Sequence, residues 1–203
     1  PKRKPYKKGD PIKMIFQPTP WRGLNVLLAA MQMVKNKNIK LDVYSSTQVY
    51  GDAFKEANDH KWVPLYKQAS ELPNVNYIGY RPNKFILDNL QNYHIFAYPS
   101  IWEETSCISA IECMSAGLYS IVTNYGALYE TCSEFPIYVQ YLEDYKLLAK
   151  SFATAIDIAA DTLHLDVIQN NLDMQQDFYK RFYSWEKQAD TWSNFLRGVT
   201  NVK

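Results

Sequence analysis

Two acidic residues flank a segment that is otherwise almost free of charge. Glu104 and Glu112 are eight residues apart, and Glu112 is the only charged residue from Thr105 to Tyr129. On a helix, this spacing would place the two carboxylates about 12 Å apart along the axis and about 80° apart around it. Free backbone amides at the entrance of such a helix, together with the positive end of its dipole, attract anions. We expect four residues to supply these amides: Thr105, Ser106, Cys107 and Ile108.

An anion site between two carboxylates suits an elongated ligand with hydroxyl groups at both ends and negative charge in the middle. A carboxylate that accepts two hydroxyl hydrogen bonds recognises a vicinal diol well. A nucleoside diphosphate sugar, with ribose, pyrophosphate and hexose in line, has this layout. The alternative is that Glu112 is an ordinary solvent-side residue on a half-buried helix, because an unpaired buried charge would cost several kcal/mol.

The elements that must position these groups alternate between short apolar runs and amphipathic segments. The apolar runs predict strands at residues 12–16, 41–44, 75–78, 95–98, 119–123 and 137–139. Helical spacing predicts helices at residues 24–34, 50–71, 85–90, 107–116, 142–160, 165–181 and 185–197, with an interruption at Pro64 and a stop at Gly117. This pattern predicts an α/β fold: a doubly wound, Rossmann-like parallel sheet of about six strands, with helices on both faces and a helical C-terminal segment. Ligands of such sheets bind beyond the carboxyl ends of the strands.

The last predicted helix has a recognisable start. Ser184 precedes it and is a preferred residue type for capping a helix N-terminus. Trp185 and Trp192 follow at helical spacing, so we expect this pair to pack in the core.

Composition excludes several classes of protein. The 203 residues carry 22 Lys and Arg against 21 Asp and Glu, a formal charge of +1, so no global positive field indicates nucleic acid as a partner. No apolar run approaches the roughly 20 residues of a membrane span. The three cysteines form an odd, sparse set that is typical of a reducing compartment, so we expect a cytoplasmic protein.

Residue types that hold metals or dinucleotides are absent or scattered. The sequence has no G-x-G-x-x-G turn, no phosphate-binding G-x-x-x-x-G-K-[ST] loop and no D-x-D pair, and His60, His94 and His164 lack metal-site spacing. We therefore expect no metal site and no cofactor. The first 14 residues contain six Lys or Arg and one acid, which indicates a basic linker or arm. Such an arm is either a solubilising tail or an anchor for an anionic surface, so peripheral association with the cytoplasmic face of a membrane stays open.

The segment Y-P-S-I-W-E-E-T-S-C-I-S-A-I-E-C-M-S-A-G, residues 98–117, resembles a family signature. It resembles the E-x7-E motif of retaining glycosyltransferases of the GT-B fold in the glycosyl transferases group 1 (family four). The likeness extends along nearly the whole chain, through P-T-P-W-R-G-L-N-V-L-L-A-A, N-V-N-Y-I-G-Y-R-P-N, A-G-L-Y-S-I-V-T-N-Y-G-A-L-Y-E and F-Y-S-W-E-K-Q-A-D-T-W.

The resemblance implies roles for individual residues. It implies that Glu104 touches the donor sugar, that Glu112 holds the ribose hydroxyls, and that Arg22 grips the diphosphate. The amides from Thr105 to Ile108 would meet sugar and phosphate, and the backbone around Tyr80 and Arg81 would lie against the base. On this basis Glu104 and Arg22 are the candidate catalytic residues.

The resemblance also implies that this chain is one half of a GT-B fold. We expect a basic linker or arm at residues 1–11 and a nucleotide-sugar donor-binding domain at residues 12–203, with the N-terminal acceptor domain missing from this chain. The whole enzyme would transfer a hexose from a nucleotide diphosphate sugar to an acceptor hydroxyl with retention of configuration and without a metal. The chain alone would be inactive.

The chain departs from the family pattern at three places, of which Ser106-Cys107 and Gln17 support an alternative, a non-catalytic nucleotide-sugar-binding or scaffolding module of the same fold. Many relatives have Phe-Gly where this chain has Ser106-Cys107, many have a second cation where this chain has Gln17, and a later glycine is Ala127.

Several assignments stay open from the sequence. Arg22 could stack on Trp21 instead of binding phosphate, and Arg81 could be solvated. Trp102 could line the sugar pocket or pack in the core. A cysteine at a helix start is expected to have a lowered pKa, but for Cys107 we expect backbone donation rather than a catalytic thiolate.

Overall fold

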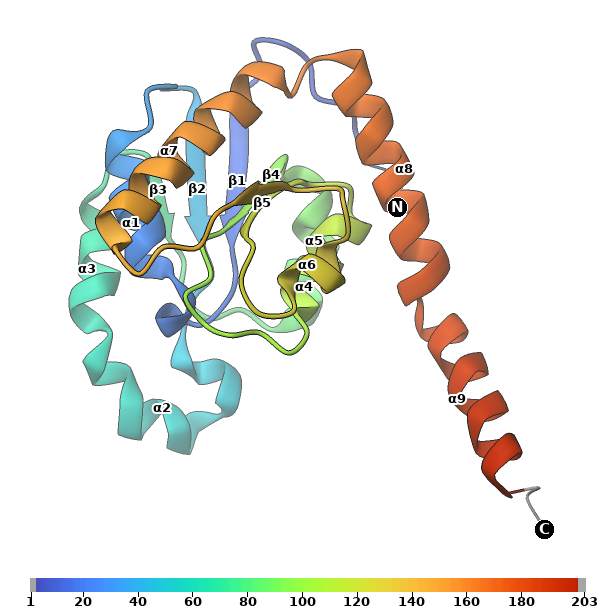
Figure 1. The fold of residues 1–203 in the computed structure, drawn as a ribbon. Helices are drawn as coiled ribbons and strands as arrows, with labels where there is room; N and C mark the ends of the chain where they lie inside the picture. Colours follow the sequence, from blue (N-terminus) through green and yellow to red (C-terminus); the bar gives the residue numbers. More distant parts are fainter. Residues whose placement is uncertain (1–2, 201–203) are drawn as a thin grey trace.

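A parallel sheet forms the centre of the computed structural model, which describes residues 3–200. Its six strands lie in the order β3-β2-β1-β4-β5-β6 (Figure 1). They are β1 (Ile12–Phe16), β2 (Ile39–Val43), β3 (Val75–Tyr77), β4 (Ile95–Tyr98), β5 (Tyr119–Thr123) and β6 (Ile137–Val139). The α/β prediction is confirmed, with four strands at the predicted bounds, β2 shifted toward the N-terminus and β3 one residue shorter.

The strand order reverses next to β1. The chain builds β1, β2 and β3 toward one edge and then returns to place β4 on the other side of β1, where Met14 pairs with Ile95. All residues of β4 and β5 are buried, as expected for central strands that helices cover on both faces. The loops after β1 and β4 therefore diverge at the carboxyl end of the sheet and leave a crevice there.

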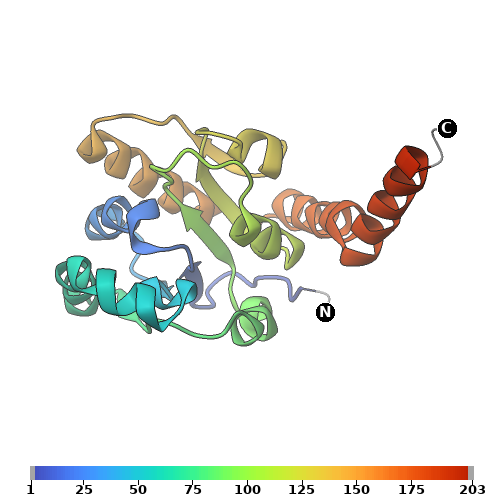
Figure 2. The same ribbon diagram turned by 90° about the horizontal axis from the view of Figure 1, so that it is seen from below.

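Nine α-helices lie within the described residues. They are α1 (Leu24–Met33), α2 (Asp52–Asn58), α3 (Val63–Glu71), α4 (Asn83–Asn89), α5 (Ile108–Ser115), α6 (Leu128–Cys132), α7 (Tyr145–Thr162), α8 (Asp166–Tyr183) and α9 (Trp185–Thr200). Helices α1, α3 and α7 cover one face of the sheet, and α4, α5, α6 and α8 cover the other (Figure 2). None of these helices combines the length and the apolar character of a membrane span.

The helical region at residues 50–71 is broken, but not where the sequence predicts. The break falls at a single 3₁₀ turn, η3 (Asp59–Lys61), between α2 and α3. Pro64 lies in the first turn of α3 instead of interrupting it. The first turn tolerates proline because its backbone N–H groups have no partner within the helix.

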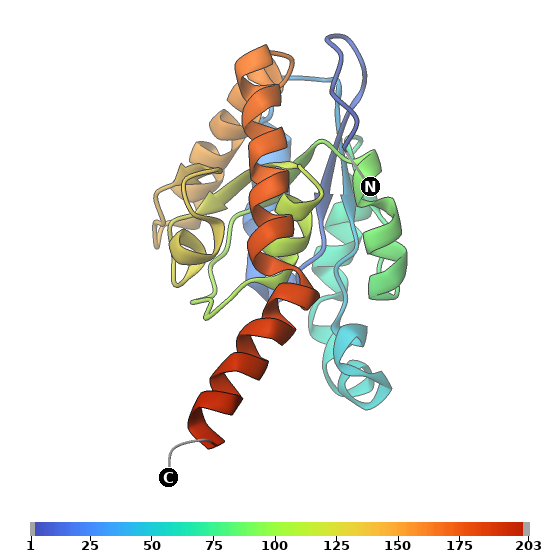
Figure 3. The same cartoon turned by 90° about the vertical axis from the view of Figure 1, so that its right-hand side faces the viewer.

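The last helix projects away from the sheet (Figures 1 and 3). Ser184 caps it as predicted, since its Oγ accepts a hydrogen bond from the Lys187 amide at 3.2 Å. The prediction that Trp185 and Trp192 lie in the core is wrong: the two residues are 87% and 60% exposed, and α9 has no buried residue. Helical spacing identifies an apolar face, but not what packs against it.

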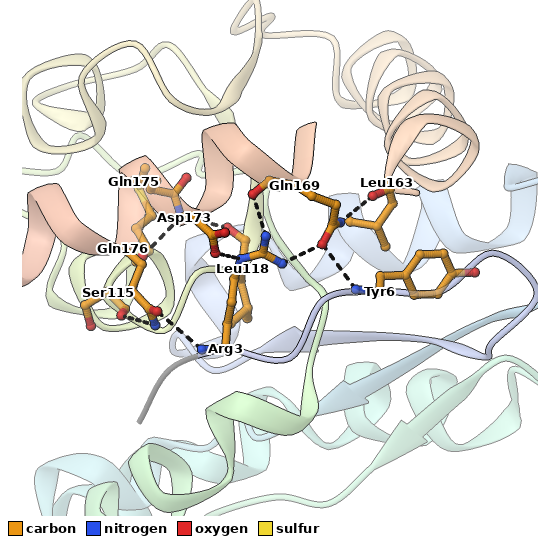
Figure 4. A network of polar contacts seen from close by, with 10 residues as sticks. Arg3, Tyr6, Ser115, Leu118, Leu163, Gln169, Asp173, Gln175 and Gln176 are labelled. Atoms are coloured by element: carbon orange, nitrogen blue, oxygen red, sulfur yellow. Dashed lines mark hydrogen bonds and ion pairs between the residues drawn. The ribbon is translucent and has the colours of Figure 1, made fainter. Parts of the chain in front are cut away.

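Residues 3–8, here called the N-terminal strap, lie against α8 and are not an exposed arm throughout. Lys4, Lys7 and Lys8 are exposed, whereas Arg3 and Tyr6 are buried. Figure 4 shows the Arg3 side chain among polar groups of α8.

Three residues of α8 hold Arg3. Its Nε pairs with Asp173 Oδ1 at 2.9 Å, and its Nη1 donates to Gln169 Oε1 at 2.7 Å (Figure 4). The Arg3 amide donates to Gln176 Oε1 at 3.3 Å. A Cβ at Gly117 would lie 2.5 Å from Arg3 Cδ, so the strap can only pass beside a glycine at this position.

Two buried glutamines of α8 bind the carboxyl end of α5. Gln175 Nε2 donates to the carbonyls of Met114 and Leu118 at 3.1 and 3.0 Å, and Gln176 Nε2 donates to the Ser115 carbonyl at 3.0 Å. Met114 and Ser115 are the last two residues of α5, where carbonyl groups have no amide partner within the helix. These hydrogen bonds also fix α5, whose opposite end faces the crevice.

Candidate functional site

A cleft of about 520 Å³ lies at the carboxyl end of the sheet. Its walls come from the loop after β1, the segment after β2, the loop between β3 and α4, and the start of α5. This is the position at which the strand order reverses, where ligands of doubly wound sheets bind.

Seven of the nine predicted site residues line this cleft. They are Arg22, Tyr80, Arg81, Ser106, Cys107, Ile108 and Glu112. Glu104 and Thr105 are not among the lining residues. Glu104 precedes the start of α5 by four residues, so the geometry expected for two acids on one helix does not apply.

Glu112 is half-buried, and both of its carboxylate oxygens accept a side-chain amide. Gln17 Nε2 donates to Oε2 at 3.2 Å, and Asn83 Nδ2 donates to Oε1 at 2.9 Å. Burial raises the pKa of the Glu112 carboxyl, while the bonds from Asn83 and Gln17 act to lower it. Glu112 therefore lies in the cleft wall with each carboxylate oxygen bonded to a side-chain amide.

Glu104 is buried beneath the cleft. Its Oε1 accepts hydrogen bonds from the hydroxyl of Tyr98 and from Nη1 of Arg22. Burial alone would lower the pKa of the Arg22 guanidinium, but the bond to Glu104 raises it, so Arg22 stays charged. Glu104 thus acts on the cleft indirectly, through its bond to Arg22 in the cleft wall.

The Arg22 side chain is 25% exposed and lies in the cleft wall. Its guanidinium carbon is 5.7 Å from the centre of the Trp102 ring, so Arg22 stacks on Trp102 and not on Trp21. The Trp21 ring stacks on Tyr50 instead, with centroids 5.9 Å apart. Trp102 itself is 49% exposed and does not pack in the core.

A glycine fixes the position of Arg22. Gly23 has a φ of 109°, and a Cβ there would lie 2.1 Å from the carbonyl oxygen of Pro99. The segment that carries Arg22 can pass beside the end of β4 only because residue 23 has no side chain.

A second glycine fixes the loop that carries Glu104. A Cβ at Gly126 would lie 2.5 Å from the Glu104 nitrogen, and the Ala127 amide donates to the Glu104 carbonyl at 2.7 Å. The turn after β5 thereby supports the backbone of the loop that leads into α5.

The start of α5 opens into the cleft. Cys107 is its N-cap residue and makes no side-chain capping bond, and Ser106, Cys107 and Ile108 all line the cleft. Burial raises the pKa of the Cys107 thiol to about 12, so the expectation of a lowered pKa is wrong. The backbone amides near the thiol favour the thiolate, but burial has the larger effect.

Tyr80 and Arg81 lie at the rim of the cleft. Tyr80 is 42% exposed, and Arg81 Nη1 donates to the Tyr80 carbonyl at 2.8 Å. The guanidinium of Arg81 has no acidic partner in the part of the chain that the structure describes, which leaves its charge available to a ligand.

Sequence reasoning missed the residues that orient the two acids. Asn83 gave no signal beyond its place after a proline, and Tyr98 appeared only as the end of an apolar run. Gln17 was noted as a replacement for a cation, not as a partner of Glu112. In the described chain, Gln17 Oε1 and Thr19 Oγ1 are buried polar atoms without a hydrogen-bond partner, and both residues line the cleft.

Comparisons with known proteins agree with this architecture. The family model described as glycosyl transferases group 1 matches residues 2–164. No curated protein matches the chain.

Solved structures share the fold at low sequence identity. A glycosyltransferase from Rickettsia africae has a TM-score of 0.73 and 17% identity, over 97% of this chain and 50% of its own. Sucrose-phosphate synthase from Thermosynechococcus elongatus has a TM-score of 0.73 and 18% identity, over 98% and 47%. HepE of Anabaena in complex with UDP has a TM-score of 0.67 and 16% identity, over 91% and 49%. The chain therefore spans about half the length of these proteins.

Proposed function

The chain belongs to the glycosyl transferases group 1 family, and we propose that it is the donor-binding part of a retaining glycosyltransferase. The complete enzyme would transfer a hexose from a nucleoside diphosphate sugar to an acceptor hydroxyl without a metal ion. Because the chain spans about half of the matching structures, the acceptor-binding part would be supplied by another segment. We place the enzyme in the cytoplasm, with peripheral membrane contact as an option.

One observation carries the proposal: a carboxylate, a helix N-terminus and a guanidinium group meet in one cleft. Glu112 accepts from hydroxyl groups, the amides at the start of α5 meet phosphate oxygens, and Arg22 neutralises the diphosphate. These groups together suit a ligand that carries a ribose and a pyrophosphate. The exposed guanidinium of Arg81 at the rim adds a second positive charge near the base or the phosphates.

Catalysis in such an enzyme depends on the leaving group. When the bond between the hexose and the diphosphate breaks, negative charge develops on the diphosphate. Arg22 and the amides of α5 would stabilise that charge in a partly buried site, where electrostatic interactions are strong.

Glu104 would act through Arg22. Its bond to Arg22 keeps the guanidinium oriented, and both described hydrogen bonds to its carboxylate go to Oε1. Because Glu104 does not line the cleft, its role in this proposal is to orient Arg22 and not to touch the donor hexose.

Uridine nucleotides are the first ligands to test. HepE of Anabaena was solved with UDP and with UDP-glucose, and the pneumococcal O-GlcNAc transferase GtfA with UDP and GlcNAc. At 13–17% identity these proteins share the fold alone with this chain, so the base and the sugar must be determined by experiment.

The second candidate is a non-catalytic nucleotide-sugar-binding module of the same fold. Gln17 favours it, because this neutral side chain lies in the cleft wall and is bonded to Glu112. Such a module would bind the donor but, even within a longer chain, would show no turnover.

Calorimetry with UDP-, GDP- and ADP-sugars tests the proposal. We expect one nucleotide to bind, Glu112→Gln to weaken it, and Arg22→Ala to weaken the diphosphate more than the nucleoside. Removal of a charged hydrogen-bond partner predicts a loss of about tenfold or more in each case. Arg197→Ala, on the exposed helix α9, is the matched control. If Glu112→Gln and Arg22→Ala bind like the parent chain, the site assignment is wrong.

A further inference from the structure

Three elements that are distant in the sequence meet at the carboxylate of Glu112. Gln17 directly follows β1, Asn83 is the first residue of α4, and Glu112 lies in α5. The two amides approach different oxygens, with Gln17 on Oε2 at 3.2 Å and Asn83 on Oε1 at 2.9 Å. The carboxylate is thus held from both sides and cannot rotate without breaking one of the two bonds.

The acceptor capacity of this carboxylate is half used. An ionised carboxylate offers about four acceptor positions. The two amides occupy one position on each oxygen, so one position on each oxygen remains. Two neighbouring hydroxyl groups of one ligand need two acceptors side by side, and the remaining positions supply them.

Gln17 itself is well anchored. Besides Glu112, its Nε2 lies 3.4 Å from the Ser109 carbonyl and 3.7 Å from Cys113 Sγ, both one turn or less from Glu112 on α5. The side chain therefore bridges the end of β1 to the cleft side of α5. A shift of either element would change the orientation of the Glu112 carboxylate.

We propose that Gln17 and Asn83 are positioning residues that hold Glu112 ready for the vicinal hydroxyls of a ribose and thereby make the site select ribonucleotides over deoxyribonucleotides. This inference rests on the proposed function, because it requires a nucleoside diphosphate in the cleft. It adds that the preference for ribose over deoxyribose depends on the neutral side-chain amides of Gln17 and Asn83.

The charge state of Glu112 depends on the same two amides. Burial raises its pKa, and each amide donor opposes this effect. Loss of one donor should therefore raise the pKa further. Among the described lining residues Glu112 is the only carboxylic acid and none is a histidine; the cations are Arg22 and Arg81. Cys113, next to Glu112, has a pKa raised well above its usual value by burial and stays a thiol.

The test compares ribose and deoxyribose ligands on the full chain. Calorimetry would measure the affinities of UDP and 2′-deoxy-UDP, and of the corresponding ADP and GDP pairs, for the parent chain, Gln17→Met, Gln17→Glu and Glu112→Gln. The matched control is Gln68→Met, a half-buried glutamine of α3 outside this cleft.

The expected result is a change in selectivity rather than in overall affinity. We expect the parent chain to prefer the ribonucleotide about tenfold, the effect of one hydrogen bond to a charged group. Gln17→Met should lower this ratio about threefold or more toward that of Glu112→Gln, while affinity for the deoxyribonucleotide changes little. Gln17→Glu adds a negative charge beside Glu112, so it should lower the ratio and also weaken both nucleotides. Gln68→Met should keep the parent ratio.

The pH dependence provides a second readout. The ratio of the two affinities should fall as the pH falls through the pKa of Glu112, and in Gln17→Met this fall should begin at a higher pH. Titration of the phosphate itself cancels in the ratio.

Other results would overturn the proposed function or the inference. If none of the nucleotides binds the parent chain, the proposed function fails, and the inference fails with it. If the parent chain binds ribose and deoxyribose forms equally, or if Gln17→Met keeps the parent ratio and pH profile, the proposed function stands and the inference is wrong. If Gln17→Met weakens both forms equally, Gln17 is only structural, which also overturns the inference.

Discussion

At the scale of single residues, burial decides the reactivity of the cysteines. Cys107, Cys113 and Cys132 are all buried, and burial raises the pKa of each thiol, to about 12 for Cys107. A thiol with this pKa is ionised to only about one part in ten thousand at pH 8.

We therefore expect iodoacetamide to leave the folded chain unmodified at pH 8 and to modify three cysteines in denaturant. Mass spectrometry would measure both states, and the denatured sample is the control for reagent activity. Modification should increase with pH only as the pH approaches the raised pKa. Rapid modification of Cys107 at pH 8 would show that its thiol is accessible and ionised, against the structure.

Arg22 and Glu112 line the cleft as the sequence predicted, whereas Glu104 is buried beneath it. Glu112 is conspicuous because no other charge lies near it in the sequence, and Arg22 because it precedes a glycine that begins a helix. The orientation of Glu104 depends on Tyr98 and Arg22, which approach it from two other segments. A non-helical loop such as the one before α5 has no periodicity from which a side-chain direction could be predicted.

At the scale of elements, helix α7 offers a clean test of N-capping. Asp144 Oδ1 accepts hydrogen bonds from the amides of Lys146 and Leu147 at 2.9 and 3.2 Å. Replacement of such a cap by alanine costs about 1 kcal/mol. We expect Asp144→Ala to lower the free energy of unfolding by this amount in urea denaturation.

The adjacent exposed residue provides the control for this cap. Glu143→Ala removes a charge at the same helix end but no capping bond, so its free energy of unfolding should stay close to that of the parent chain. Equal losses in the two variants would mean that the capping bonds of Asp144 do not stabilise α7.

The sheet was predictable from the sequence because its central strands are continuous apolar runs. Runs such as Ile95–Tyr98 and Tyr119–Thr123 are buried on both faces, which leaves little doubt about their bounds. The helical segments were harder. Pro64 fits the first turn of a helix as well as a break, and the apolar face of α9 has the same periodicity whether or not it is covered.

At the scale of the whole molecule, the two ends of the described chain contribute differently to stability. No residue of α9 is buried, whereas Arg3 and Tyr6 of the N-terminal strap are. Deletion of residues 185–203 should therefore change the melting temperature little. Deletion of residues 1–11 should lower it by several degrees, because Asp173 and the glutamines of α8 would lose their partner.

Thermal denaturation followed by circular dichroism would compare the two truncated chains with the parent chain. Arg3→Ala removes the ion pair with Asp173 but keeps the rest of the strap. It should therefore lower the melting temperature by part of the amount that the deletion does. If removal of α9 destabilises the sheet as much as removal of the strap, the strap is not a specific part of the fold.

The fold class of the sheet could be predicted from the sequence, but the packing of the strap against α8 could not. The first 14 residues, which include the strap, contain six basic residues and few apolar ones, and such a segment appears solvated in any local window. Its contacts lie more than 160 positions away, between Arg3 and Gln169. Nothing in the local sequence indicates that Arg3, one of these six basic residues, is buried.

The bonds between the strap and α8 also determine how the molecule would respond to mechanical load. Arg3 is fastened to Asp173 and Gln169, and α8 leads directly into α9. Tension applied between residue 3 and residue 200 would be carried by this ion pair and by the backbone of α8, and the sheet would be bypassed. In a single-molecule pulling experiment, the first event should therefore be a small extension, released when the contacts of Arg3 with α8 break while the six strands are still paired.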